Sequence, residues 1–173
     1  MIRRIPWLQR QFFLEHPAGE LAYVIERLRG TPSRLKVLVA DIPKDHLIRR
    51  QGEAWSIQEN IGHLLDVETL WHGRLDDFEQ QKQVLRPADL ENRRTFEANY
   101  NNRSLLELQV AFNESRAWLV ERLELVDETA GSRISQHPRL DRPMKIVDLM
   151  FFAAEHDDHH MARITELINS FDG

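Results

Sequence analysis

Two histidines, one helical turn apart, are the residues of this chain best placed to do chemistry. His156 and His160 lie in FFAAEHDDHHMARITEL, residues 151–167, which lacks glycine and proline and is rich in strong helix formers. Imidazoles at positions i and i+4 of a helix project from one face and can bind one divalent ion between them. The alternative interpretation is two ordinary hydrogen-bonded histidines. A metal site also needs a third ligand from elsewhere in the chain.

His63 is the candidate for that third ligand. It lies two turns into another predicted helix, at the edge of the apolar arc and in line with Val67 and Leu70. A lone histidine in such a place is more often a hydrogen-bonded core residue than a ligand. Three neutral imidazoles from two helices would leave a fourth coordination position for water or substrate, which is typical of a catalytic site. His159 could replace one partner through i, i+3 spacing, although it lies further round the helix.

Other metal-binding patterns are excluded or weak. The chain contains no cysteine, so thiolate ligands and disulfides are impossible. No Glu-x-x-His occurs, whereas a ferritin-like di-iron site needs it twice. The run HDDHH only approaches the H-E-x-x-H motif, because Asp157 is a shorter acid that points away from the histidine stripe.

Three carboxylates are close enough in the sequence to support the ligands. Glu59, Asp66 and Glu155 could accept hydrogen bonds from the N–H groups of metal-bound imidazoles, although surface charge is the simpler interpretation of each. The remaining histidines are expected to be solvated or in loops; they are His16, His46, His72 and His137.

The composition is that of an ordinary globular protein. The chain has 173 residues, of which 42% are hydrophobic and 29% charged, and its net charge is −5. This length predicts one domain over residues 1–173, and the acidic balance argues against nucleic-acid binding. No apolar run reaches the roughly 20 residues of a membrane span. Residues 1–13 lack the pattern of a signal peptide, so we expect a cytoplasmic protein whose arm, residues 1–16, packs on the body.

Helical periodicity accounts for most of the chain. Residues 17–29 and 33–40 predict either two helices or one kinked helix, with Thr31 as an N-cap before Pro32. Ser56 and Glu59 form a capping box that starts a helix extending to about residue 83.

Two further helices complete the pattern. Ser104 and Glu107 open one that extends to about residue 126, and the last runs from near 143 to near 170. The intervening segments are polar, and no strand pattern is present. Four long helices without strands predict an all-α four-helix bundle. The connection of about 20 residues between the second and third could span the bundle and allow these helices to be parallel.

Four segments, in order and spacing, resemble the DinB-like superfamily and the YfiT-like metal-dependent hydrolases within it. They are LRGTP at 28–32, WSIQENIGHLLDVE at 55–68, YNNRS at 100–104 and AEHDDHH at 154–160. The resemblance covers roughly residues 20–170.

The resemblance implies an up-down-down-up bundle, commonly a homodimer, with a divalent ion, often zinc or nickel, bound by His63, His156 and His160. Activities in the family include hydrolysis and thiol transfer from low-molecular-weight thiols, so a small-molecule substrate is expected. Arg163 is a departure, because many members have glutamine near this position. A non-catalytic metal-binding or regulatory bundle is the alternative function.

Overall fold

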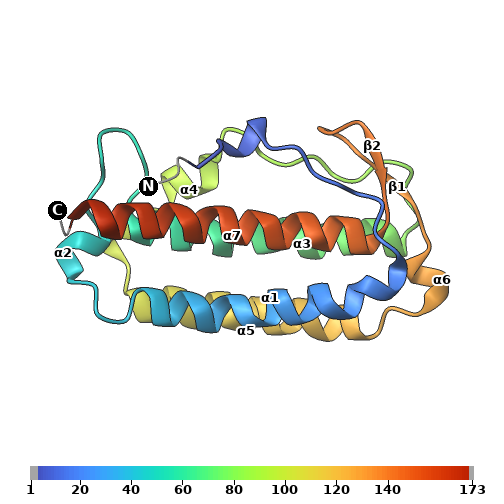
Figure 1. Cartoon of the computed structure of the whole chain (residues 1–173), viewed down its shortest axis with the longest axis horizontal. Coiled ribbons are helices and arrows are strands. Elements are labelled where there is room, and N and C mark those ends of the chain that lie inside the picture. The colour runs from blue at the N-terminus through green and yellow to red at the C-terminus, as the bar shows by residue number, and fades with distance from the viewer. Residues whose placement is uncertain (1–3, 172–173) are drawn as a thin grey trace.

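Four long helices form the body of the protein in the computed structural model, which describes residues 4–171 (Figure 1). They are α1 (Leu21–Leu38), α3 (Ile57–Glu79), α5 (Leu105–Glu124) and α7 (Ile146–Phe171). Helices α1 and α3 each pack against both α5 and α7. The predicted four-helix bundle is therefore confirmed. Within residues 4–171, no helix is both long and apolar enough to cross a membrane.

The order of helix directions is up-down-down-up. Helices α1 and α7 run in one direction along the bundle, and α3 and α5 run in the other (Figure 1). Because α3 and α5 are parallel neighbours, the segment between them must return along the whole bundle. Residues 80–104 do so, and they include the short helices α4 (Arg93–Glu97) and η3 (Tyr100–Asn102).

Two extended segments cover one side of the bundle. The N-terminal arm carries η1 (Trp7–Gln9) and η2 (Ala18–Glu20), and it runs along the bundle on the same side as residues 80–104 (Figure 1). Leu14 of the arm is buried, and Trp7 and Phe12 pack against core residues. These segments form the outer wall of the cleft described below.

Helix α1 is one helix that continues through Pro32, so the predicted N-cap at Thr31 is wrong. Proline lacks an N–H group and leaves the carbonyl oxygen four residues earlier, on Leu28, without its usual helical donor. Arg116 of α5 donates to that oxygen instead, at 3.2 Å. The Thr31 hydroxyl donates to Asp157 at 2.9 Å rather than capping a helix.

For α3 and α5, whose starts were predicted from capping residues, the predicted starts are closer to the observed ones than the predicted ends are. Ser56 and Glu59 make both hydrogen bonds of a capping box, and Ser104 accepts from the Glu107 amide. Helix α3 ends at Glu79 rather than near 83, and Gln81 has a φ of 55°. A non-glycine residue in this left-handed region cannot continue a right-handed helix.

The prediction of no strands was wrong for one short hairpin. Strands β1 (Ser135–His137) and β2 (Arg142–Met144) pair antiparallel, with Ser135 opposite Met144. The amide of Leu85, in the connection after α3, donates to the Gln136 carbonyl oxygen at 3.0 Å. This hairpin depends on a partner distant in sequence, which explains why the local pattern does not show it. The remaining short helices are α2 (Lys44–Leu47) and α6 (Glu128–Gly131).

A buried polar layer divides the apolar core into two halves. Arg116 of α5 is 1% exposed and donates to Glu68 of α3 at 2.6 Å and to Asp157 of α7 at 2.5 Å. With the Thr31 contact from α1, all four long helices meet in this layer. Asp157 thus points away from the histidine stripe, as predicted, and lies in the bundle interior.

Candidate metal centre

Three histidine side chains from α3 and α7 converge at one buried point. One ligand nitrogen of each of His63, His156 and His160 lies within 4.8 Å of the other two. The Nε2 atoms of His63 and His156 are 3.4 Å apart. Two nitrogens bound tetrahedrally to one zinc ion, each about 2.1 Å from it, would also be about 3.4 Å apart. The His63–His156 pair is therefore spaced as two ligands of one metal ion are, and His160 lies close enough to be the third.

A chain of hydrogen bonds orients His63. Its Nδ1 is 3.0 Å from the Thr95 hydroxyl oxygen, and that hydroxyl donates to Asp66 at 2.8 Å. Because the Thr95 hydroxyl donates its only proton to Asp66, its oxygen accepts a hydrogen bond from Nδ1–H of His63. The Nε2 atom of His63 is then the unprotonated nitrogen, and its lone pair faces the other histidines. Tyr100 also donates to Asp66, at 2.6 Å, and holds this carboxylate in place.

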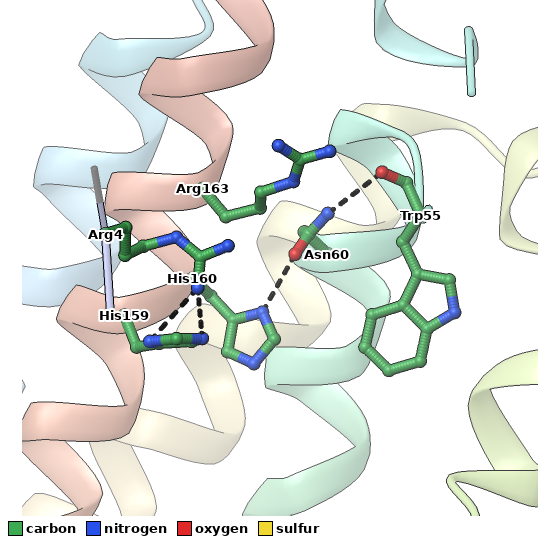
Figure 2. A pocket seen from close by; sticks show the side chains of 6 residues that line it. All are labelled: Arg4, Trp55, Asn60, His159, His160 and Arg163. Carbon is green, nitrogen blue, oxygen red and sulfur yellow. Dashed lines mark hydrogen bonds between the residues drawn. The ribbon is translucent and has the colours of Figure 1, made fainter. Parts of the chain in front are cut away.

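An amide performs the same task for His160. The Asn60 Oδ1 atom is 2.8 Å from Nδ1 of His160, and the Asn60 amide nitrogen donates to the Ser56 carbonyl oxygen at 2.7 Å. Figure 2 shows Asn60 between the imidazole and the backbone of Trp55. Nδ1 of His160 therefore carries the proton, which leaves Nε2 as the lone-pair nitrogen.

His156 is held by packing instead. Its ring lies 5.0 Å from the Trp7 ring and 6.0 Å from the Trp71 ring, measured between centroids. Its Nδ1 atom is buried and has no hydrogen-bond partner among residues 4–171. The nitrogen that faces His63 is Nε2, so aromatic packing rather than a hydrogen bond holds this ring with Nε2 toward the cluster.

Burial keeps all three imidazoles neutral. It lowers the pKa of His63 to about 4, and it lowers the pKa values of His156 and His160 well below their usual value. Repulsion between the neighbouring imidazoles lowers the pKa values of His156 and His160 further. A histidine must be neutral to bind a metal ion, so the protein holds these three in the required protonation state at neutral pH.

His159 does not join the other three. Its ring packs against Trp7 at 5.4 Å, and its Nε2 lies 2.6 Å from a guanidinium nitrogen of Arg4 (Figure 2). Arg163 extends from the next turn and donates to Glu166 and Gln51. Both side chains line a small pocket of about 170 Å³ beside His160 (Figure 2).

The three predicted supporting carboxylates have different positions. Glu59 accepts from Arg50 and from the Ser56 amide, and Glu155 accepts from Arg27 and Arg10. Within residues 4–171, neither carboxylate contacts a histidine of the cluster. Only Asp66 supports the cluster, and it acts through Thr95.

Sequence reasoning missed Thr95 and Asn60, the residues that contact the candidate ligands directly. Asn60 is one turn before His63 on α3, which could have been a signal, but it bonds to His160 on another helix. Thr95 lies in α4, within the polar connection, where no local pattern marked it. Its hydroxyl reaches His63 only because residues 80–104 fold back along α3.

Two other histidines are buried, contrary to the prediction that they are solvated or in loops. His72 stacks on Trp118 with centroids 4.2 Å apart, and its Nε2 lies 3.1 Å from the Ser115 carbonyl oxygen. His137 is on β1 and is 2% exposed. Tertiary contacts bury both rings, so the polar sequence around His137 was a poor guide.

The histidine cluster opens into a large cleft. This cleft has a volume of about 860 Å³ and extends between the α3–α7 surface, the N-terminal arm, the connection after α3 and the hairpin. Six apolar side chains contribute to its lining: Trp7, Leu8, Val67, Leu70, Trp71 and Phe152. A small organic molecule could therefore reach the histidines.

Comparison with known proteins identifies similar folds. The family model described as the DinB superfamily matches residues 27–164. YfiT from Bacillus subtilis, described as a probable metal-dependent hydrolase with an unusual four-helix bundle topology, superposes with a TM-score of 0.82 at 18% identity, covering 94% of each chain. A Streptococcus pneumoniae protein superposes with a TM-score of 0.64 at 17% identity, covering 91% of each chain. No curated protein matches the sequence.

Proposed function

This chain belongs to the DinB superfamily, and from that membership we propose that it is a metal-dependent enzyme with one divalent ion bound by His63, His156 and His160. The observation that carries the proposal is the convergence of three buried, neutral imidazoles that line an open cleft. Three ligands leave room for a water molecule or a substrate atom. A fourth protein ligand, which a closed structural site would need, is absent from the described residues.

The residues around the site would position the ligands and limit access of water. Thr95 and Asn60 hold two imidazoles with their lone pairs toward the centre. Trp55 lies against His63, with ring centroids 4.7 Å apart, and Trp7 covers His156. A bound divalent ion would lower the pKa of a coordinated water or thiol toward neutrality.

Two reaction types follow from that chemistry. Activated water would hydrolyse an ester, amide or related bond. An activated low-molecular-weight thiol would form a carbon–sulfur bond at an electrophilic carbon of a second substrate and displace that substrate's leaving group. The description of YfiT as a probable metal-dependent hydrolase supports hydrolysis, and thiol transfer occurs among proteins that the sequence resembles. Zinc and nickel both accept three imidazole ligands, and we propose one of these two as the ion.

The first test is elemental analysis of untagged protein. We expect about one zinc or nickel per chain in the wild type and a sharp loss of metal in His63→Ala, with helicity retained. His159→Ala is the matched control, because His159 lies on the same helix surface but outside the cluster, and it should keep its metal. Full metal content in His63→Ala would remove His63 from the ligand set.

The second test separates an enzyme from a non-catalytic bundle. Metal-loaded and chelator-treated protein would be screened with ester and amide substrates, and with low-molecular-weight thiols plus an electrophile. Turnover that needs the ion and disappears in His63→Ala supports the proposal. A protein that binds metal stoichiometrically but shows no metal-dependent turnover with either class would favour the non-catalytic alternative.

A further inference from the structure

A buried arginine without an ion-pair partner lies further along the same cleft. Arg74 of α3 is 1% exposed, and it lines the cleft. Its Nε donates to the Arg86 carbonyl oxygen at 3.1 Å, and Nη1 lies 3.0 Å from Nε2 of His137. No carboxylate within residues 4–171 forms an ion pair with it, and its Nη2 makes no hydrogen bond there. Burying an unpaired charge is costly, so such a group needs an explanation.

A second arginine in the same part of the cleft is also unpaired. Arg139, in the turn of the hairpin, is half-buried and lines the cleft, and its guanidinium lies 5.7 Å from the centroid of Phe152. Among the described residues it forms neither an ion pair nor a hydrogen bond through its side chain. Burial and the two nearby guanidinium groups lower the pKa of His137 to about 3, so this ring is uncharged. The local charge is therefore positive.

The nearest acidic group on α3 is already neutralised. Asp77, one turn after Arg74, accepts hydrogen bonds from Arg86 at 2.8 Å and from Lys82 at 2.7 Å. The Arg86 guanidinium packs so closely on α3 that a Cβ atom at Gly73 would lie 2.0 Å from it. Glycine at this position keeps Arg86 close to Asp77. Asp77 is thus engaged by two other cations, and within residues 4–171 it forms no ion pair with Arg74 or Arg139.

The distance between Arg74 and the histidine cluster limits the length of a ligand that could reach both. The Arg74 guanidinium carbon is 5.8 Å from the Trp71 ring centroid, which is 6.0 Å from the His156 ring centroid. Together these distances place the guanidinium no more than about 12 Å from the candidate metal ligand. Apolar side chains, including Trp71 and Phe152, line the cleft between the two polar ends.

We propose that Arg74 and Arg139 bind the anionic end, a carboxylate or phosphate, of an elongated substrate whose other end reacts at the histidine cluster. Guanidinium groups recognise both anions through pairs of parallel hydrogen bonds, and an anion there would neutralise the buried charge. The substrate is then a molecule with a reactive head, an apolar middle and an anionic tail. Its assignment as a substrate rests on the proposed function, whereas the anion site does not.

The test measures binding of two simple anions by isothermal titration calorimetry. Inorganic phosphate and hexanoate would be titrated at low ionic strength into metal-free protein, so that binding to a metal ion cannot contribute. We expect at least one to bind, more weakly as salt increases. Arg74→Met and Arg139→Met should each reduce the affinity about tenfold or more, which is the size expected for a hydrogen bond to a charged group. Binding of only one probe would identify the tail as phosphate or carboxylate.

Arg29→Met is the matched control, because Arg29 is exposed on α1, pairs with Glu124 and does not line the cleft. Arg74→Met removes a buried charge that has no ion-pair partner, and it also removes the donor to the Arg86 carbonyl oxygen. Because these two effects oppose each other, its melting temperature should stay close to that of the wild type. If it fails to fold, Arg139→Met on the hairpin still tests the site. Absence of binding for both probes, or equal affinity in both cleft variants and the wild type, would overturn the proposal.

The anion site and the metal-dependent enzyme can fail separately. His63→Ala, which should lose the metal, is expected to keep Arg74-dependent anion binding. Such binding in a protein that never takes up metal would leave the anion site standing and refute the proposed function. Metal-dependent turnover without any anion binding would support the proposed function and refute the anion site.

Discussion

Each oriented imidazole of the histidine cluster depends on one hydrogen bond to a neutral side chain. Thr95 orients His63 because its own proton is directed to Asp66, and Asn60 orients His160 because its amide nitrogen is directed to a backbone carbonyl. In both cases the second hydrogen bond, from Thr95 to Asp66 or from Asn60 to the backbone, leaves an oxygen as the atom that faces the imidazole. That oxygen can only accept, so the imidazole nitrogen next to it carries the proton. This arrangement resembles the outer-shell hydrogen bonds that commonly orient metal-binding histidines.

Thr95→Val should weaken metal binding while leaving the bundle folded. Valine matches threonine in shape but leaves the Nδ1–H of His63 and one oxygen of Asp66 unpaired. Loss of such an outer contact typically costs about 10–100-fold in metal affinity. Competition with a chromogenic chelator would measure this change, and Thr95→Ser, which keeps the hydroxyl, is the control. Equal affinities in the valine and serine variants would show that the hydroxyl has no role at the metal site.

The depressed pKa values of the buried histidines predict how the metal-free protein responds to acid. In the unfolded chain a histidine binds its proton near pH 6.5, whereas folded His63 does so only near pH 4. Between these values the unfolded state binds more protons, so stability is retained above pH 6.5 and lost as the pH falls toward 4. For His63 alone the loss approaches about 3 kcal/mol.

Urea unfolding of chelator-treated protein between pH 7 and 4 would measure this loss, and His63→Ala should show a shallower dependence on pH. The same burial affects metal release. The usual pKa of histidine predicts release below about pH 6, but the lowered pKa values shift it to more acidic conditions. Steep metal loss already near pH 6 would show that the imidazoles are more solvated than the structure indicates.

At the scale of the elements, the buried polar layer joins the four long helices. Arg116 bridges carboxylates on α3 and α7 and also supplies the hydrogen bond that Pro32 denies to the Leu28 carbonyl oxygen. Burial raises the pKa of Glu68, while the adjacent arginine opposes that rise. The layer contains two carboxylates and only one guanidinium. Loss of Arg116 should therefore reduce stability more than loss of either carboxylate charge.

Arg116→Met should therefore destabilise the protein strongly, by about 3–5 kcal/mol, because it leaves two buried carboxylates and a carbonyl oxygen without a donor. Glu68→Gln is the matched variant. It removes one of two like charges and retains the Arg116–Asp157 pair, so we expect a change of about 1 kcal/mol or less. Chemical denaturation of both variants would measure the difference. Similar losses in the two variants would mean that the charge balance of the layer is unimportant.

At the scale of the whole molecule, we expect the apolar core and the helix caps to hold the bundle together without a bound ion. The two halves of the core contain most of the large apolar side chains of the four helices. We expect chelator-treated protein to remain helical and to unfold cooperatively, with a lower melting temperature because ligand binding stabilises the folded state. Circular dichroism before and after chelation would measure this. A chain that unfolds when the metal is removed would indicate a structural site.

The cleft predicts that a bound ion remains open to small ligands. Cobalt-substituted protein should change its visible spectrum when azide or a small thiol is added, because three imidazoles leave a coordination position free. Arg29→Met cobalt protein, altered far from the cleft, should respond in the same way. A spectrum that does not respond to either ligand would argue for a closed coordination shell.

The amino-acid sequence by itself determined the bundle and the three candidate ligands. Helical periodicity and the capping residues Ser56 and Ser104 depend on interactions within a few residues, so they can be read locally. The i, i+4 spacing of His156 and His160 is equally local. The motifs around His63 resemble a known family, and this resemblance marks His63 as the third candidate ligand.

The tertiary structure decided the contacts that connect distant segments. Thr95 reaches His63 only because residues 80–104 fold back along the bundle, and the hairpin forms only against the connection after α3. Burial of Arg74 and His137 in the cleft and the continuation of α1 through Pro32 have the same origin. In each case the contact that stabilises the arrangement is made with a residue far away in the sequence. A local pattern of residue types cannot predict which residue that will be.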